Sequence, residues 1–161
     1  MNKVVFAAAL LLSFTCIASP ATQMDADKKS EMDKLMSLMR AAGPYAPGMG
    51  KSGDEVCKKM ADDMVTKYGS HLSQLGKSPT DIRDSSYGLC VNAISSAENA
   101  RSENEVEMWK TSALKNVEDQ LQGDTRAYSP REFLIESINN SVRIARPFYF
   151  MKELSVKYNV R

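Results

Sequence analysis

Apolar residues recur at helical spacing through most of the chain, and no segment shows the sustained apolar–polar alternation of an exposed strand. The first apolar stripe follows an i, i+3, i+4, i+7 pattern and consists of Met32, Leu35, Met36 and Met39. This pattern predicts an amphipathic helix over 28–42. Gly43 and the proline after it end that helix, and residues 45–54, rich in glycine, are expected to form a loop.

The next two helices are predicted from their apolar stripes together with start and stop signals. A second helix is expected over 54–68, with Gly69 as its stop and a short extra turn up to Gly76. Ser78 is followed by a proline, which is the usual combination of an N-cap and a first helical residue. A third helix should therefore begin there.

Two later serines mark further helix starts in the same way. Ser102 has Glu105 three residues later, the spacing of a capping box, and Gly123 closes the helix that follows. Ser129, again followed by proline, starts the next helix, which Pro147 is expected to break or kink before a separate terminal helix. The whole pattern predicts an all-α fold, a compact bundle of five to six short amphipathic helices.

The amino end has the pattern of a secretory signal peptide. Lys3 precedes an uninterrupted apolar run over 4–12, which matches a signal sequence and is too short to span a bilayer. Small residues then allow cleavage after Ala18 or as late as Ala21. We therefore predict export to the periplasm or the extracellular space, with 1–18 as signal peptide, a flexible segment over 19–27 and one helical domain over 28–161.

The three cysteines are divided by this cleavage. Cys16 would be discarded; the alternative, lipid attachment at Cys16, is disfavoured because bulky Phe14 stands where small residues are usual. Cys57 and Cys90 remain, and both lie on apolar stripes. In an oxidising compartment we expect them to form a disulfide joining the second and third helices. A redox pair or metal ligands are the alternatives, but a C-x-x-C spacing and accompanying histidines are lacking.

Charge and composition restrict the classes of partner. The chain has 21 basic and 20 acidic residues, and loss of Lys3 would leave 20 of each (21 − 1 = 20). A balanced charge argues against nucleic-acid binding, which depends on a basic surface. The chain also carries no apolar segment long enough for a stable membrane span.

Catalytic patterns are weak. The only histidine, His71, stands in a turn-like context, so multi-histidine metal sites such as H-E-x-x-H are excluded. No serine stands in a G-x-S-x-G context. The sequence therefore predicts no enzyme and no cofactor, and a hydrolase with an unrecognised pair of carboxylates remains an alternative.

Two clusters are candidate binding residues. The aromatic cluster near the carboxyl end, accompanied by arginines, is a candidate interface: Arg143, Arg146, Phe148, Tyr149 and Phe150. Three consecutive aromatic residues cannot all face one side of a helix, so at least one is expected on the surface, although a wedged core helix is the alternative. Met32, Met36 and Met39 share one helix face and are weak candidates for Cu(I) binding, since thioethers are soft ligands.

These observations favour an exported, non-catalytic protein-binding domain. The expected partner is another protein, with a homodimer left open. An immunity- or inhibitor-like protein and a periplasmic chaperone are the two versions, both by analogy with small disulfide-bonded helical chains. A soft-metal binder and a hydrolase are the alternatives from other classes.

Overall fold

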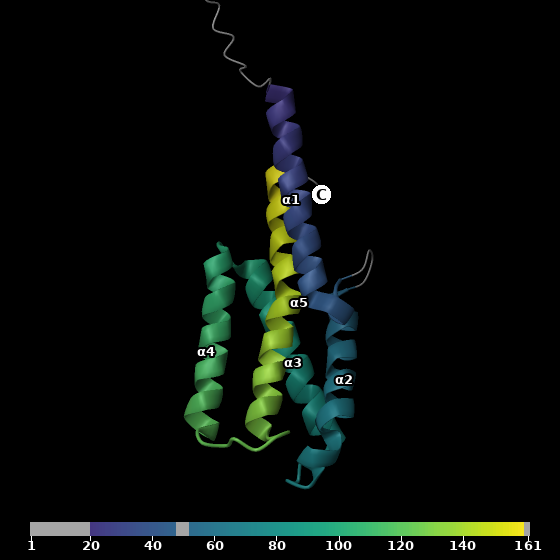
Figure 1. Cartoon of the computed structure of the whole chain (residues 1–161), viewed down its shortest axis with the longest axis vertical. Helices are drawn as coiled ribbons and strands as arrows, with labels where there is room; N and C mark the ends of the chain where they lie inside the picture. The colour runs from purple at the N-terminus through teal and green to yellow at the C-terminus, as the bar shows by residue number, and fades with distance from the viewer. Residues whose placement is uncertain (1–19, 48–51, 160–161) are drawn as a thin grey trace, which may run out of the picture. The chain divides into compact units, whose positions relative to one another are not determined.

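The computed structural model describes residues 20–47 and 52–159, so the predicted signal peptide 1–18 lies outside the described residues. These residues form five α-helices and one short 3-10 helix, with no strand among them (Figure 1). The elements are α1 (Pro20–Ala42), η1 (Gly43–Tyr45), α2 (Gly53–Ser73), α3 (Pro79–Asn99), α4 (Glu103–Leu121) and α5 (Pro130–Tyr158). The all-α prediction is confirmed, and no described helix is long and apolar enough to cross a bilayer.

The chain divides into two units, Met1–Met32 and Asp33–Arg161. In the described part of the first unit, the chain is already helical at Pro20, so the expected flexible segment over 19–27 belongs to α1 from Pro20 onward. The second unit contains the end of α1 and all of α2 to α5. The core and the candidate site described below belong to this second unit.

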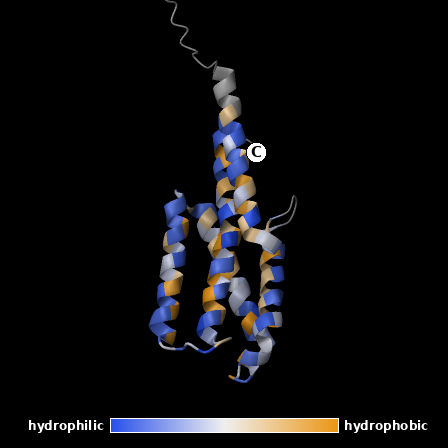
Figure 2. Cartoon of the chain, viewed as in Figure 1, coloured by the Kyte–Doolittle hydropathy of each residue, from blue (hydrophilic) through white to orange (hydrophobic). Residues whose placement is uncertain are grey.

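Helix α5 is the central element of the second unit and packs against α2, α3 and α4. Its buried positions lie around most of its circumference, as expected for a helix with neighbours on several sides. Figure 2 shows hydrophobic and hydrophilic residues interleaved along each helix, the amphipathic pattern expected from the sequence. The largest fully buried side chains include Tyr68, Met60, Met64, Leu72, Ile82, Ile138 and Ile144.

Small residues line the contact between α3 and α5. Ser86 from α3 and Ser137 from α5 are both fully buried, and their hydroxyl oxygens lie 3.2 Å apart. Ser141, one turn further along α5, donates its hydroxyl to the backbone carbonyl of Ser137 at 2.7 Å. Since each hydroxyl has a partner, these serines can be buried without a large desolvation penalty. Their small size allows the two helix backbones to approach closely.

The helix starts mostly follow the predicted caps. The Ser78 hydroxyl accepts a hydrogen bond from the backbone N–H of Asp81, and the Asp81 carboxylate accepts one from the backbone N–H of Ser78. Ser129 caps α5 in the same manner through the N–H of Glu132. The capping box predicted at Ser102 is wrong, because the Ser102 side chain makes no cap bond and the Glu105 carboxylate accepts from the N–H of Arg101 instead.

This difference between two serines gives the first testable prediction. Replacing Ser78 with alanine should lower the free energy of unfolding by about 1 kcal/mol, since it removes the acceptor for an otherwise unsatisfied helical N–H. Replacing Ser102 with alanine should change stability by only a few tenths of that amount, since no cap bond is lost. Urea denaturation of both variants measures the difference. Equal losses of stability would contradict the cap assignment.

Two helix ends differ from the sequence-based expectation. Gly69 does not stop α2, which continues to Ser73 and takes in His71. Pro147 does not separate two helices but lies inside a continuous α5. Pro147 is itself buried, and so are Ala145 before it and Tyr149 after it. Packing on both sides therefore holds the helix together across a residue that lacks an N–H donor.

Candidate functional site

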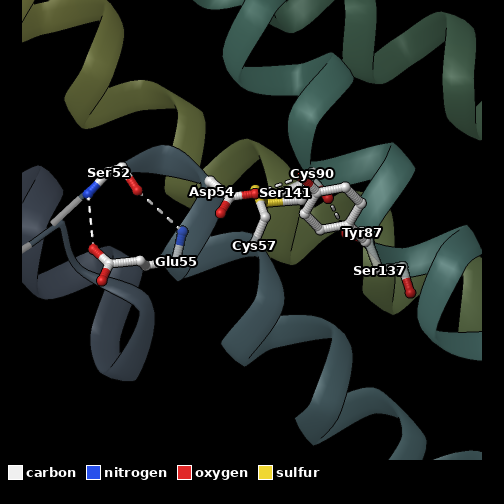
Figure 3. Close-up of a disulfide and its surroundings, with 8 residues drawn as sticks. All are labelled: Ser52, Asp54, Glu55, Cys57, Tyr87, Cys90, Ser137 and Ser141. Carbon is white, nitrogen blue, oxygen red and sulfur yellow. Dashed lines mark hydrogen bonds between the residues drawn. A yellow bond between two sulfur atoms is a disulfide. The ribbon is translucent and has the colours of Figure 1, made fainter.

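A disulfide fixes the relative position of α2 and α3. The sulfur atoms of Cys57 and Cys90 are 2.02 Å apart, their Cα atoms are 5.5 Å apart, and both residues are fully buried. Figure 3 shows this bond with Asp54 of α2 and Tyr87 of α3 beside it. The predicted disulfide pair is therefore present. Residues one turn away from the two cysteines are held in a defined register.

A hollow of the described surface, which we call the α2–α3 groove, lies next to this disulfide. It has a volume of about 530 Å³, within the usual range for binding sites. Its lining residues are Lys58, Ala61 and Asp62 of α2 and Arg83, Asp84 and Tyr87 of α3. Two cationic groups, two carboxylates and one phenol thus converge on one surface.

Two contacts across the groove connect its walls. The Arg83 guanidinium Nε donates to Asp62 Oδ1 at 2.7 Å, and the Tyr87 hydroxyl donates to Asp54 Oδ1 at 2.6 Å. Lys58, one turn after Asp54, pairs with the other carboxylate oxygen at 2.6 Å. These groups are exposed, so each pair adds little to stability. They do hold the polar side chains in place.

The hydrogen bonds at this end of the groove shift the protonation equilibria. Hydrogen bonds from Lys58 and then from Tyr87 lower the pKa of the Asp54 carboxyl. The hydrogen bond to Asp54 raises the pKa of the Tyr87 phenol. At neutral pH the carboxylate is therefore ionised and the phenol protonated, which are the states that this hydrogen bond requires.

A second hollow, of about 310 Å³, lies among α3, α4 and α5. It contains Trp109 of α4, which is half-buried, together with apolar side chains and uncharged amides. Helix α4 buries only Val106 and Val117 among its described residues, and its half-buried Trp109 and Ala113 line this hollow. Because its walls carry no charge, this hollow offers less discrimination between partners than the α2–α3 groove.

The candidate interface near the carboxyl end is mostly covered by the chain itself. Tyr149 and Phe150 are buried, with exposed fractions of 7% and 8%, and Phe148 is half-buried against the core. Tyr149 and Phe150 therefore lie in the core, whereas Phe148 keeps part of its surface exposed, and the interface stays a prediction. Arg146 pairs with Glu107, which leaves Arg143 as the exposed member of the five candidates.

The covering of these aromatic side chains has identifiable sources. Lys34 of α1 lies over the Phe150 ring at 4.9 Å from its centroid, and Lys152 lies 5.4 Å from the Tyr149 centroid. Phe148 lies close to the start of α2, where a Cβ added to Gly53 would stand 3.6 Å from the Phe148 ring. Helix α5 thus has neighbours around it at this level. The sequence could not indicate this, since helical spacing gives directions and not neighbours.

The other singled-out residues lie outside the α2–α3 groove. Met32 and Met36 are exposed and Met39 is half-buried on α1, so the thioether hypothesis stays a prediction. His71 is exposed near the end of α2, where its ring stacks on Tyr128 with centroids 4.3 Å apart. Among the described residues, no group of three or more His, Cys, Asp or Glu side chains is placed to hold a metal ion.

A hydrogen-bond cluster joins α2 to the first half of α5. The buried Tyr68 donates its hydroxyl to Glu136 Oε2 at 2.6 Å, and Lys67 pairs with the same oxygen at 2.6 Å. Burial raises the pKa of Tyr68, and the hydrogen bond to Glu136 raises it further. For Glu136 burial acts to raise the pKa, but the hydrogen bonds from Lys67 and Tyr68 outweigh it and the net shift is downward.

This cluster predicts acid sensitivity. A carboxyl whose folded pKa lies below its ordinary value of 4.5 stabilises the fold above that pH, and the contribution is lost as the pH falls through the folded pKa. Glu136→Gln should therefore cost about 1 kcal/mol at neutral pH, and the difference from wild type should shrink on acidification. Urea denaturation from about pH 7 to about pH 2 measures this. The exposed control Glu98→Gln should run parallel to wild type; a pH-independent cost for Glu136→Gln would contradict the assignment.

Comparisons with known proteins give no relative from which the role of the groove could be inferred. No protein-family model matches the chain, and no curated protein or solved structure is significantly similar to it. The sequence patterns did not single out the polar residues that line the groove. A signal was nevertheless present, because the disulfide places Lys58 and Ala61 beside the α3 turn that precedes Cys90.

Proposed function

We propose that this chain is an exported, non-catalytic protein-binding domain of the inhibitor or immunity type, and that it binds its partner at the α2–α3 groove. The observation that carries the proposal is the groove itself, about 530 Å³ of hollow surface lined by Arg83, Tyr87 and charges of both signs. Arginine and tyrosine are among the residue types that contribute most to protein–protein binding energy. Charges of both signs give selectivity among partners.

Rigidity supports the inhibitor version. The groove walls are two helices joined by a buried disulfide and by the Arg83–Asp62 and Tyr87–Asp54 contacts. A surface held in its binding conformation loses less entropy when the partner binds. A chaperone, by contrast, would need to expose apolar surface, and the Tyr149 and Phe150 side chains of α5 are buried.

The protonation equilibria support a binding role over hydrolysis. A general acid needs a carboxyl with a raised pKa. The hydrogen bonds from Lys58 and Tyr87 lower the pKa of Asp54, and the groove carboxylate of Asp62 is paired with Arg83. Charged groups paired in this way suit recognition of another surface.

Export is supported by the cysteines and by the amino-terminal pattern. A buried Cys57–Cys90 bond is stable in an oxidising compartment, and such bonds are rare in reducing ones. The apolar run over 4–12 behind Lys3 has the length of a signal sequence. Mass spectrometry of the native protein tests both, since it measures the cleavage site and the state of the two cysteines.

The binding proposal is tested by capture of the partner from the native compartment. The wild type should retain a partner that the double variant Arg83→Ala/Tyr87→Ala loses, with at least about a tenfold weaker affinity once the partner is purified. The matched control Arg126→Ala/Tyr158→Ala removes one arginine and one tyrosine outside the groove. It should retain the partner. Unchanged affinity of the groove variant, or no partner that binds in purified form, would refute the proposal.

The chaperone version is separated by a circular-dichroism titration from about pH 7 to about pH 2. An acid-stress chaperone needs to lose its cooperative fold at low pH in order to expose apolar surface. An inhibitor of the proposed kind should keep a cooperative thermal transition wherever it binds its partner. Partner binding that persists only after the cooperative transition is lost would favour the chaperone version.

A further inference from the structure

The α2–α3 groove contains one charged group without a partner. Within the described part of the chain, no hydrogen bond or ion pair joins the Asp84 carboxylate to another side chain, although Asp84 lines the groove. The cations of the groove are already engaged, Arg83 with Asp62 at 2.7 Å and Lys58 with Asp54 at 2.6 Å. The charge available to a ligand is therefore negative.

An aromatic ring lies beside this carboxylate. Tyr87 follows Asp84 by three residues on α3, so the two side chains are neighbours on one helix face, and both line the groove. The Tyr87 hydroxyl is held by Asp54 at 2.6 Å, which fixes the end of the side chain. A carboxylate and an aromatic ring side by side form a combination that attracts a cation.

We propose that the α2–α3 groove receives an arginine side chain of the partner protein, with its guanidinium against the Asp84 carboxylate and the Tyr87 ring. The inference rests on the proposed protein-binding function and specifies the chemistry of the partner's contact. A planar guanidinium can donate two parallel hydrogen bonds to a carboxylate and stack on a ring, whereas a lysine ammonium is a compact point charge.

The charges around the groove favour a basic contact over an acidic one. Three carboxylates, those of Asp54, Asp62 and Asp84, accompany two cations, those of Lys58 and Arg83. An acidic side chain would meet cations that already face a carboxylate, Arg83 beside Asp62 and Lys58 beside Asp54, so its attraction to them is partly neutralised. An arginine side chain meets Asp84 without breaking any contact.

Nuclear magnetic resonance titration with small probes tests this inference. The disulfide-bonded protein is titrated with N-acetyl-arginine methylamide, with its neutral citrulline analogue and with the lysine analogue. The arginine probe should shift the amide resonances of Asp84 and Tyr87 in a saturable manner. Its dissociation constant should be at least about fivefold lower than that of either analogue. Asp84→Asn should remove this preference, and the control Asp119→Asn on α4 should not.

The outcomes are decisive and separate from those of the capture experiment. Equal affinity for arginine and citrulline, equal affinity for arginine and lysine, or absence of saturable shifts would each overturn the arginine assignment. None of these results would affect the protein-binding proposal, which depends on loss of a purified partner by Arg83→Ala/Tyr87→Ala. Conversely, a preserved arginine preference in a protein without any partner would leave the assignment of the groove standing and refute the proposed function.

Discussion

Replacing both Cys57 and Cys90 with alanine is expected to lower the free energy of unfolding by about 3.5 kcal/mol or more. The two residues are separated by 33 positions, so the bond removes much of the conformational entropy of the unfolded chain. Both cysteines are also fully buried, and their loss leaves the core less well packed. Urea denaturation monitored by circular dichroism measures the difference.

Reduction of the wild-type protein provides the control for this experiment. Reduced protein keeps both sulfur atoms but loses the bond, so it should lie between the oxidised form and the double alanine variant. In the reduced protein α2 and α3 are no longer tied, and the groove should lose affinity for its partner. An alanine variant as stable as the oxidised wild type would contradict the role assigned to the disulfide.

Substitution of Tyr68 should have a comparable effect on stability. Tyr68→Leu removes a fully buried ring that makes edge-to-face contacts with Phe133 and Tyr128, at centroid distances of 5.5 and 5.8 Å. It also removes the hydroxyl donor to Glu136. We expect a loss of about 3–5 kcal/mol, since both a cavity and a lost hydrogen bond contribute.

The conservative variant separates these two contributions. Tyr68→Phe keeps the ring and removes only the hydroxyl, so it should cost about 1.5–3 kcal/mol, the range for a hydrogen bond to a charged group. In the background of Glu136→Gln the same substitution should cost less, because the acceptor is no longer charged. Equal costs for Tyr68→Leu and Tyr68→Phe would show that the ring packing contributes little.

The sequence was a good guide to the elements of the fold where local chemistry decides them. Ser78 and Ser129, each followed by proline, begin helices in the structure as predicted, and Cys57 pairs with Cys90. At these positions one side chain or one backbone preference is enough to determine where a helix begins or which cysteines pair. Where tertiary packing determines the structure, the prediction from local sequence was wrong. Helix α5 continues through Pro147, with Ala145 and Tyr149 buried on either side of it.

The candidate site was harder to predict from the sequence than the helices were. The aromatic cluster at Phe148 and Phe150 is dense in the sequence, yet Phe150 is buried beneath Lys34 of α1 and Phe148 is half-buried near the start of α2. The groove residues Arg83 and Tyr87 look like ordinary polar positions of an amphipathic helix. Only the neighbouring helix, brought close by the disulfide, converts them into a lined hollow.

Hydrogen exchange of the protein with and without its captured partner tests most directly whether binding occurs at the α2–α3 groove. We expect the partner to slow exchange in the segments that carry the groove, around Lys58 and Asp62 of α2 and around Asp84 and Tyr87 of α3. Segments of α4 should exchange at unchanged rates. Protection confined to α4, or to the carboxyl-terminal turns of α5, would contradict the assignment of the groove as the binding surface.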